Sequence, residues 1–276
     1  MRSVIVTADD FGLSQSLDAG IIEAHQRGIV SAASIVACGD AFEGAVVLAR
    51  ENPRLEIGVH LTLDEERPLV SGLRTLVDRN GGFWTRNALV ARLCTGRIDL
   101  DEVERCWRAE IQRVVDAGLR PGFLNSHGHM HGFPSLLPIA GRLAGEFGVP
   151  ALRRPVEPLT IRGSSPARCV KDALVTMSAR YAFARAGHGG PRTTDYFTGL
   201  SYSGRLNGER LQRALGQLKN GVTELMTHPG RADADTRRKY GHWGYAWEAE
   251  LDALVTTSLP QHITLTTFQT SLGRAA

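Results

Sequence analysis

Apolar residues along the first part of the chain follow two different periods. Short β-branched runs at Val4–Thr7, Ser31–Cys38 and Leu55–Leu63 predict buried strands. Between them, apolar positions recur at helical spacing in Ser14–Gly28 and Asp40–Arg50, which predict two helices. This order of strand, helix, strand, helix and strand predicts a parallel sheet with right-handed crossover connections.

Residues at the starts of the predicted helices support these boundaries. Ser14 can cap the first helix, and Asp40 followed by Glu43 has the pattern of a capping box. Asp99 can cap a long helix whose apolar face includes Trp107 and which ends at Gly118.

The second half of the chain continues to alternate between strands and helices. Predicted helices are Pro134–Phe147, Lys171–Ala186, Asn207–Lys219 and Glu248–Thr257, and predicted strands are Gly122–Leu124, Ala151–Arg154, Val222–Thr227 and Ile263–Phe268. The pattern weakens from Pro68 to Thr85, which we interpret as an insertion loop, and from residue 158 to residue 195. No internal repeat or low-complexity linker divides the chain, so residues 1–276 are predicted to form one α/β domain.

Composition narrows the class of protein. Apolar residues make up 42% and charged residues 22% of the 276 residues, which is ordinary for a globular domain. A formal charge of +3 without a Lys/Arg run does not predict nucleic-acid binding. The four cysteines are scattered, which favours reduced thiols and a cytoplasmic location over a disulfide framework. No apolar run approaches the ~18 residues of a transmembrane helix.

Polar residues at the ends of the predicted strands are the candidates for function. They are Asp9, Asp10, His60, His127 and His228. The carboxyl ends of parallel strands form the active-site rim in α/β folds, and in barrels this is nearly universal. Other interpretations exist for each: a solvated turn for the two carboxylates, a buried core position for His60, and a turn position for His228.

The segment Asn125–His131 holds three of the nine histidines within five residues. If it were extended, its alternation of His with Gly and Met would place the three imidazoles on one side of the chain. A His-rich polar loop is the simpler interpretation. The more specific interpretation is a metal site or a proton-transfer site, because neutral imidazole is the commonest metal ligand.

Together these residues predict a hydrolytic centre. Two imidazoles and one carboxylate would leave coordination positions of a metal open, as a catalytic site requires. A second carboxylate could take a proton from water, and a further histidine could protonate a leaving amine, which amounts to amide hydrolysis. A metal phosphoesterase and a non-catalytic sugar-binding protein are the competing hypotheses.

Four segments in order resemble the YdjC-like (ChbG) carbohydrate deacetylases. They are Thr7–Gly12 (TADDFG), Gly58–Leu63 (GVHLTL), Asn125–His131 (NSHGHMH) and Thr227–Pro229 (THP). The segment Val149–Pro158 also resembles the HpnK branch, which is associated with hopanoid biosynthesis. The resemblance implies a (β/α) barrel-like fold related to polysaccharide deacetylases, with catalytic residues at the carboxyl ends of parallel strands.

The resemblance also implies roles for individual residues. Asp10, His60 and His127 match the family's metal ligands, Asp9 matches its catalytic base, and His228 takes the place of its catalytic histidine. The cofactor is therefore expected to be a divalent metal ion, either Mg or Zn. Many relatives have Asp where this chain has Asn125, which removes a charge next to His127 but does not remove a ligand.

The expected substrate is an N-acetylated amino sugar of the N-acetylglucosamine type. His131, Arg153 and Trp243 are expected to bind it. The HpnK-like segment, and the aromatic residues around Trp243, favour a hopanoid-linked or other lipid-linked glycan. A free chito-oligosaccharide is the alternative, and those aromatic residues could instead serve to pack their loop. The resemblance further implies that the chain can form a homodimer.

Overall fold

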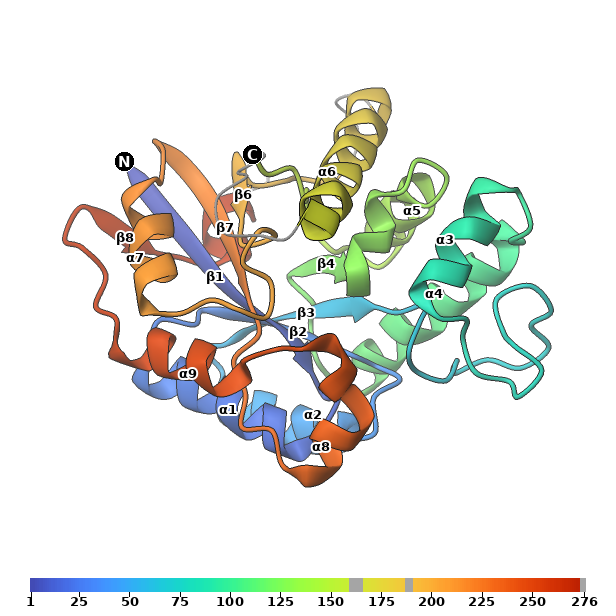
Figure 1. The fold of residues 1–276 in the computed structure, drawn as a ribbon, viewed down its shortest axis with the longest axis horizontal. Helices are drawn as coiled ribbons and strands as arrows, with labels where there is room; N and C mark the ends of the chain where they lie inside the picture. Colours follow the sequence, from blue (N-terminus) through green and yellow to red (C-terminus); the bar gives the residue numbers. More distant parts are fainter. Residues whose placement is uncertain (159–165, 187–190, 274–276) are drawn as a thin grey trace.

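The computed structural model describes residues 1–158, 166–186 and 191–273, which form an eight-stranded parallel sheet with helices around it (Figure 1). The strands are β1 (Arg2–Phe11), β2 (Ala32–Ile35), β3 (Glu56–Leu61), β4 (Phe123–Ser126), β5 (Ala151–Leu152), β6 (Tyr196–Thr198), β7 (Gly221–Thr227) and β8 (Ile263–Leu265). Their order in the sheet is β5-β4-β3-β2-β1-β7-β6, and β8 also pairs with β1.

β1 is the central strand and has three partners. It pairs with β7 along Arg2–Ala8, while β8 pairs with Arg2–Val4 and β2 pairs with the stretch from Thr7 onward. Val4, Ile5 and Val6 are fully buried, as expected for a strand covered on both faces. The ends of β1 and β7 therefore bring Asp9 and His228 to the same rim of the sheet.

The sheet curves until its two ends meet. Ala151 in β5 forms an isolated parallel bridge with Arg192, which precedes β6. The backbone N–H of Leu152 donates to the carbonyl of Arg192 at 2.9 Å, and the N–H of Arg192 donates to the carbonyl of Pro150 at 3.1 Å. The predicted parallel (β/α) barrel-like fold is confirmed.

The helices pack around the outside of the sheet. They are α1 (Gln15–Arg27), α2 (Phe42–Glu51), α3 (Arg86–Cys94), α4 (Leu100–Asp116), α5 (Leu137–Glu146), α6 (Pro166–Ala186), α7 (Gly208–Gly216), α8 (Ala234–Tyr240), α9 (Trp247–Thr256) and α10 (Phe268–Leu272). In Figure 1, α6 stands beside α5 and extends away from the sheet. No helix in the described ranges has both the length and the apolar character needed to cross a membrane.

Two of the predicted caps are confirmed, and one is wrong. Ser14 accepts a hydrogen bond from the N–H of Leu17, and Asp99 accepts one from the N–H of Asp101. The predicted capping box at Asp40 is not present, because Ala41 is the N-cap of α2 and makes no side-chain cap bond. Asp40 instead accepts a hydrogen bond from Lys239.

The largest correction concerns the histidine-rich segment. His127–Gly132 forms a 3₁₀ turn, not an extended chain, and both Gly128 and His129 have φ near 60°. The three imidazoles therefore point in different directions. Four short elements were also not predicted: α3, β6, α8 and α10.

Buried carboxylates hold the irregular segments against the barrel. Glu102 accepts hydrogen bonds from the backbone N–H groups of Arg74, Thr75 and Leu76 in the insertion loop. Glu157 accepts from the N–H groups of Gly199 and Ser201. These contacts satisfy backbone donors that strands and helices leave unpaired, so both loops have defined positions above the rim.

Candidate active site

The end of β1 presents two consecutive carboxylates. In a regular strand Asp9 and Asp10 would point to opposite faces, because side chains alternate. Here the register with β2 shifts between Ala8 and Phe11, and Asp10 has φ of 72°. This irregularity of the backbone allows both carboxylates to reach the neighbourhood of His60.

Asp9 lies inside the barrel and is fixed by four donors. Arg153 donates from Nη1 to Oδ2 at 2.5 Å and from Nη2 to Oδ1 at 2.8 Å. Ser34 and Asn125 each donate to Oδ1 at 2.9 Å. Burial on its own would raise the pKa of Asp9, but Arg153, His60 and His228 hold it well below the usual range for a carboxyl. Asp9 is therefore ionised, as a proton acceptor must be.

Asp10 and His60 face each other with unused ligand atoms. Oδ1 of Asp10 lies 3.4 Å from Nε2 of His60, and both atoms are buried without a hydrogen-bond partner among the described residues. Burial raises the pKa of Asp10 to about 6 and lowers that of His60 to about 4. Unsatisfied buried polar atoms are rare in native structures and need an explanation, such as an ion between them.

Asn125 sets the orientation of His60. Its Oδ1 accepts a hydrogen bond from Nδ1 of His60 at 2.8 Å, and its Nδ2 donates to Asp9. With Nδ1 protonated, Nε2 of His60 carries a lone pair directed at Asp10, which is the tautomer that a metal ligand requires. Asn125 thus bridges the two sides of the site, a role that needs both a donor and an acceptor.

His127 is held by a different pair of residues. Its Nδ1 lies 2.8 Å from Oδ1 of Asp64, and Nη2 of Arg86 lies 3.1 Å from both of its ring nitrogens. The carboxylate–imidazole pair is typical of metal-binding histidines, whereas the guanidinium lies against Nε2, the nitrogen that Asp64 leaves available to a metal. Within residues 1–158, 166–186 and 191–273, no group of three His, Cys, Asp or Glu side chains is drawn together closely enough to hold an ion.

These contacts test the fit of a metal to the donor set. Asp10 and His60 fit, because each offers a buried, unpartnered donor atom to the same point. The ring of His127 lies 5.7 Å from that of His60, centroid to centroid, so it borders the same space. Asp10 and His60 therefore offer two donor atoms to one point, whereas the ring nitrogens of His127 are in contact with the guanidinium of Arg86.

His228 follows β7 on the other side of β1. Its backbone N–H donates to Oε2 of Glu250 at 2.6 Å, and its ring packs against Tyr245 with centroids 4.8 Å apart. Nδ1 of His228 has no partner among the described residues. Burial lowers the pKa of His228 to about 3. The imidazole therefore rests in its neutral form.

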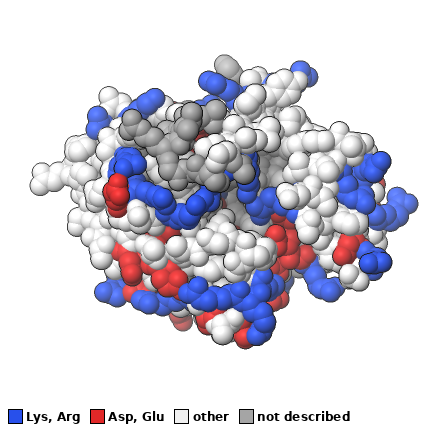
Figure 2. Space-filling model, in the orientation of Figure 1, with Lys and Arg blue, Asp and Glu red and all other residues white. Residues whose placement is uncertain are grey.

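A cavity of about 350 Å³ connects these groups to the surface. Asp9, His60, His127 and His228 line it, together with Trp243 and Tyr245 from the segment after β7. Four cations also line it, namely Arg86, Arg168, Lys171 and Arg205. Figure 2 shows Lys and Arg side chains gathered near the hollow in the middle of this face. The volume of this cavity lies in the range of small-molecule binding sites.

The three residues that were expected to bind substrate lie in different surroundings. Trp243 lines the cavity, and its ring lies 5.1 Å from that of His127. His131 is fully buried, with Nδ1 bonded to Ser126 and Nε2 to the carbonyl of Arg153. Arg153 is also fully buried, between Asp9 and Glu224. The surroundings of His131 and Arg153 suit residues that position other side chains inside the barrel. Contact of these two residues with substrate stays a prediction.

Ser34, Asp64, Arg86 and Glu224 are site residues that were not predicted. Ser34 lies in a predicted strand, but nothing in its neighbours distinguishes it from a core serine. Asp64 directly follows the predicted strand Leu55–Leu63, so the strand-end rule that identified His60 could have found it. Arg86 reaches the site from the far end of the insertion loop, which no local pattern reveals.

The site combines carboxylates and imidazoles at the carboxyl ends of parallel strands in a barrel-like α/β fold, the arrangement of many metal-dependent hydrolases. A sequence model of the YdjC-like protein family matches residues 3–264. The chain belongs to the YdjC-like family. The further assignment to the HpnK branch stays a prediction.

Individual relatives agree with this membership. A protein from Listeria innocua named carbohydrate deacetylase 1 is 32% identical over 236 residues, covering 85% of this chain and 84% of the relative. A carbohydrate deacetylase from Brevibacillus brevis is 39% identical over 148 residues, covering 53% and 57%. A crystal structure from Enterococcus faecalis, described as a candidate cellobiose-phosphate cleavage protein, covers 98% of both chains with a TM-score of 0.75 and 26% identity.

Replacing Asn125 by Leu is expected to lower kcat/KM about 10- to 100-fold, in line with the loss of a partner that orients a ligand. Leu keeps the approximate volume but leaves His60 without its acceptor and Asp9 without a donor. The Asn125→Asp variant separates these effects, because it restores the acceptor for His60 but places a second carboxylate against Asp9. Steady-state kinetics of both variants test this role, and wild-type activity in Asn125→Leu would exclude it.

Proposed function

We propose that this protein is a metal-dependent N-deacetylase that removes the acetyl group from an N-acetylated amino sugar. The observation that carries the proposal is the pair of buried, unpartnered ligand atoms on Asp10 and His60, next to an ionised Asp9. The names of the relatives in Listeria and Brevibacillus support the choice of reaction.

Asp10, His60 and His127 would hold the metal in this proposal. A divalent cation supplies polarisation of the acetyl carbonyl when bound. Asp64 would keep His127 in a fixed orientation, since it already binds Nδ1 of that ring. Two imidazoles and a carboxylate suit Zn best by ligand type, although Mg is also compatible with a carboxylate.

Asp9 would act as the general base. Its oxygens are fixed by Arg153, Ser34 and Asn125, so the carboxylate need not reorganise when it accepts a proton from the attacking water. Arg153 would act through Asp9, because its own guanidinium is buried away from the cavity surface.

His228 would deliver the proton to the leaving amine. It rests neutral, because burial lowers its pKa to about 3 while Asp9 acts in the opposite direction. Negative charge that develops on the substrate during attack favours the charged imidazolium, so His228 can take up the proton that Asp9 removed from the water, through the cavity that both residues line, and Asp9 returns to its ionised form. Breaking the C–N bond then transfers the proton to the amine nitrogen and restores the neutral ring.

Acetate release from N-acetylated glucosamine derivatives tests this function. We expect release by the metal-loaded protein, loss of release after treatment with a chelator, and recovery on adding Zn, Co, Ni or Mg back singly. Release that persists after complete metal removal would contradict the metal-dependent mechanism. No release from any acetylated sugar would contradict the deacetylase assignment itself.

The substrate is further proposed to carry an apolar group, as a lipid-linked glycan does. Trp243, Tyr240 and Tyr245 form a connected aromatic group, with Trp243 4.7 Å and 5.5 Å from the two tyrosine rings. Trp243 lines the cavity, and aromatic faces suit contact with a sugar ring or an apolar aglycone. Part of the weakly patterned stretch from residue 158 to residue 195, namely residues 159–165 and 187–190, lies outside the described residues.

Replacing Trp243 by Ala is expected to reduce kcat/KM for a lipid-linked acetylated sugar by the equivalent of about 1–3 kcal/mol, the value of one large apolar contact. Turnover of a small acetylated sugar should change far less. Parallel kinetics on the two substrates provide the measurement. Equal losses on both would assign Trp243 a structural role, and a wild-type preference for free chitobiose would contradict the lipid-linked proposal.

A further inference from the structure

The outer face of α6 carries large apolar side chains that the protein leaves exposed. Val170, Leu174, Met177 and Tyr181 are 60%, 63%, 63% and 56% exposed. Their spacing of four, three and four residues aligns them along one side of the helix, and we call them the α6 apolar row. Single exposed apolar residues are normal, but a contiguous row marks an interaction surface.

The rest of α6 is anchored to the barrel. Ala179 and Ala182 are buried, and Ser178 donates a hydrogen bond to the carbonyl of Gly132 at 3.1 Å. Arg168 and Lys171 line the catalytic cavity. The helix therefore has one face on the protein, one side at the cavity mouth, and the apolar row directed outward.

The charge of α6 is strongly positive. Arg168, Lys171, Arg180 and Arg185 stand against a single carboxylate, Asp172. Across the described ranges, no salt bridge joins Lys171, Arg180 or Arg185 to a carboxylate. Arg180 and Arg185 are exposed on the surface, where Arg185 lies 5.7 Å from the centre of the Tyr181 ring, so both can meet an external anion.

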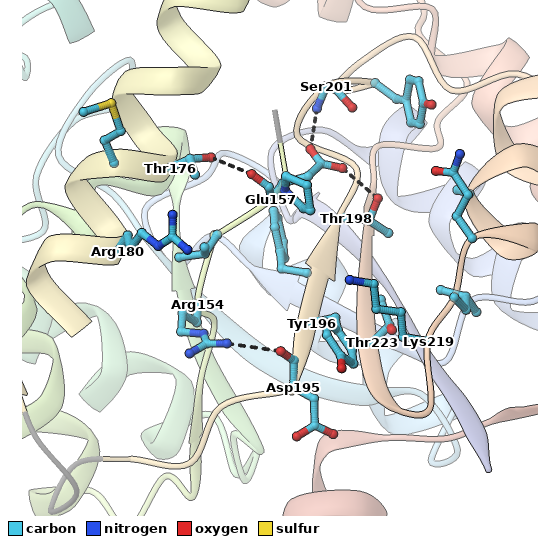
Figure 3. A pocket seen from close by; sticks show the side chains of 18 residues that line it. Arg154, Glu157, Thr176, Arg180, Asp195, Tyr196, Thr198, Ser201, Lys219 and Thr223 are labelled. Atoms are coloured by element: carbon cyan, nitrogen blue, oxygen red, sulfur yellow. Dashed lines mark hydrogen bonds between the residues drawn. The ribbon is translucent and has the colours of Figure 1, made fainter. Parts of the chain in front are cut away.

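A second cavity, of about 880 Å³, adjoins the row. Met177 lines it, as do apolar residues such as Val156 and Leu218. Figure 3 shows Arg180 and Arg154 on one side of this cavity and Lys219 on the other. Of its two carboxylates, Glu157 is buried and bonded to Thr198, Gly199 and Ser201, so it does not neutralise the cations at the mouth.

We propose that α6 docks on an anionic phospholipid surface, with the α6 apolar row inserted among the acyl chains and Arg180 and Arg185 at the headgroups. A basic helix with one exposed apolar face has the composition of an interfacial membrane helix. Pairing with a second copy of α6 would bring two strongly positive helices together, which disfavours self-association. Docking would place the catalytic cavity, lined by the same helix, beside the bilayer.

Vesicle co-sedimentation without substrate tests this docking, so its outcome does not depend on the proposed reaction. Wild type should sediment with phosphatidylglycerol-containing vesicles, bind pure phosphatidylcholine less, and be released by salt. The Leu174→Glu/Met177→Glu variant should lower the partition coefficient by about 10-fold or more. The matched control is Val47→Glu on α2, where Val47 is 50% exposed and far from the row in sequence, and it should bind as wild type.

A second variant, which changes charges and not apolar residues, keeps the test decisive if Leu174→Glu/Met177→Glu does not fold. Arg180→Glu/Arg185→Glu changes only exposed side chains and should remove the preference for phosphatidylglycerol. Absence of wild-type binding, or wild-type binding by both double variants, would overturn the proposal. Light scattering provides a further check. If the wild type is a dimer and Leu174→Glu/Met177→Glu is a monomer, a second copy covers the α6 apolar row and the proposal is overturned.

Discussion

Replacing Asp9 by Asn is expected to lower kcat by roughly 10²–10⁴-fold, the usual range for loss of a general base. Asn has the size of Asp, and its Oδ1 can still accept from Nη2 of Arg153 and from Ser34, although its amide NH2 replaces the acceptor of Nη1 of Arg153. The metal content should also be unchanged, because Asp9 is not one of the proposed ligands. Kinetics, elemental analysis and the thermal midpoint, measured on the same preparation, provide the test.

The control for this variant is Glu224→Gln. Both substitutions neutralise one of the two carboxylates that pair with Arg153, but Glu224 does not line the catalytic cavity. The Gln variant should therefore lose far less activity than Asp9→Asn at a similar cost in stability. Near wild-type turnover in Asp9→Asn would assign the base to another group.

We expect the wild-type protein to hold about one divalent ion per chain, and we expect His60→Ala or His127→Ala to remove most of it. Each substitution deletes one of three protein ligands, and a single remaining imidazole with Asp10 is a weak site for a divalent ion. Elemental analysis after dialysis against a metal-free buffer measures the loss. Undiminished metal in both variants would overturn the ligand assignment.

His131→Ala is the matched control from the same segment of the chain. Both ring nitrogens of His131 are occupied by protein groups, Ser126 and the carbonyl of Arg153, so it has no lone pair to offer a metal. We expect this variant to lower the thermal midpoint and to keep its metal. The results would distinguish His127, a proposed ligand, from His131, which we do not propose as a ligand, within one five-residue stretch of the sequence.

The sequence was sufficient to predict the fold because its signals are local and repeated. Buried strands such as Val4–Thr7 appear as β-branched runs, and Ser14 and Asp99 mark helix starts through bonds to residues two or three positions away. The rule that functional groups follow parallel strands then selected Asp9, Asp10, His60, His127 and His228, four of which line one cavity. Oδ1 of Asp10 lies 3.4 Å from Nε2 of His60, which is one of these four residues.

What the sequence did not reveal depends on contacts between distant segments. Arg153 pairs with Asp9 across the barrel interior, and its position in the short predicted strand Ala151–Arg154 gave no sign that its charge would be buried. Arg86 reaches His127 from a helix whose weak pattern was not recognised. The turn at Gly128 and His129 was missed because alternating residues suit an extended chain equally well, and only tertiary contacts decide between them.

The three partners of β1 have a consequence for biosynthesis. This strand leaves the ribosome before the other strands, yet β7 begins at Gly221 and β8 at Ile263, so their pairing with β1 must wait until those later segments are synthesised. At typical elongation rates the delay is on the order of 10–40 s, during which Val4–Val6 remains an apolar strand with an unpaired edge. The nascent chain therefore depends on shielding by the ribosome or by chaperones for longer than a protein whose first strand pairs with its immediate neighbours. Its yield in cells should respond to chaperone supply more than the stability of the finished barrel would suggest.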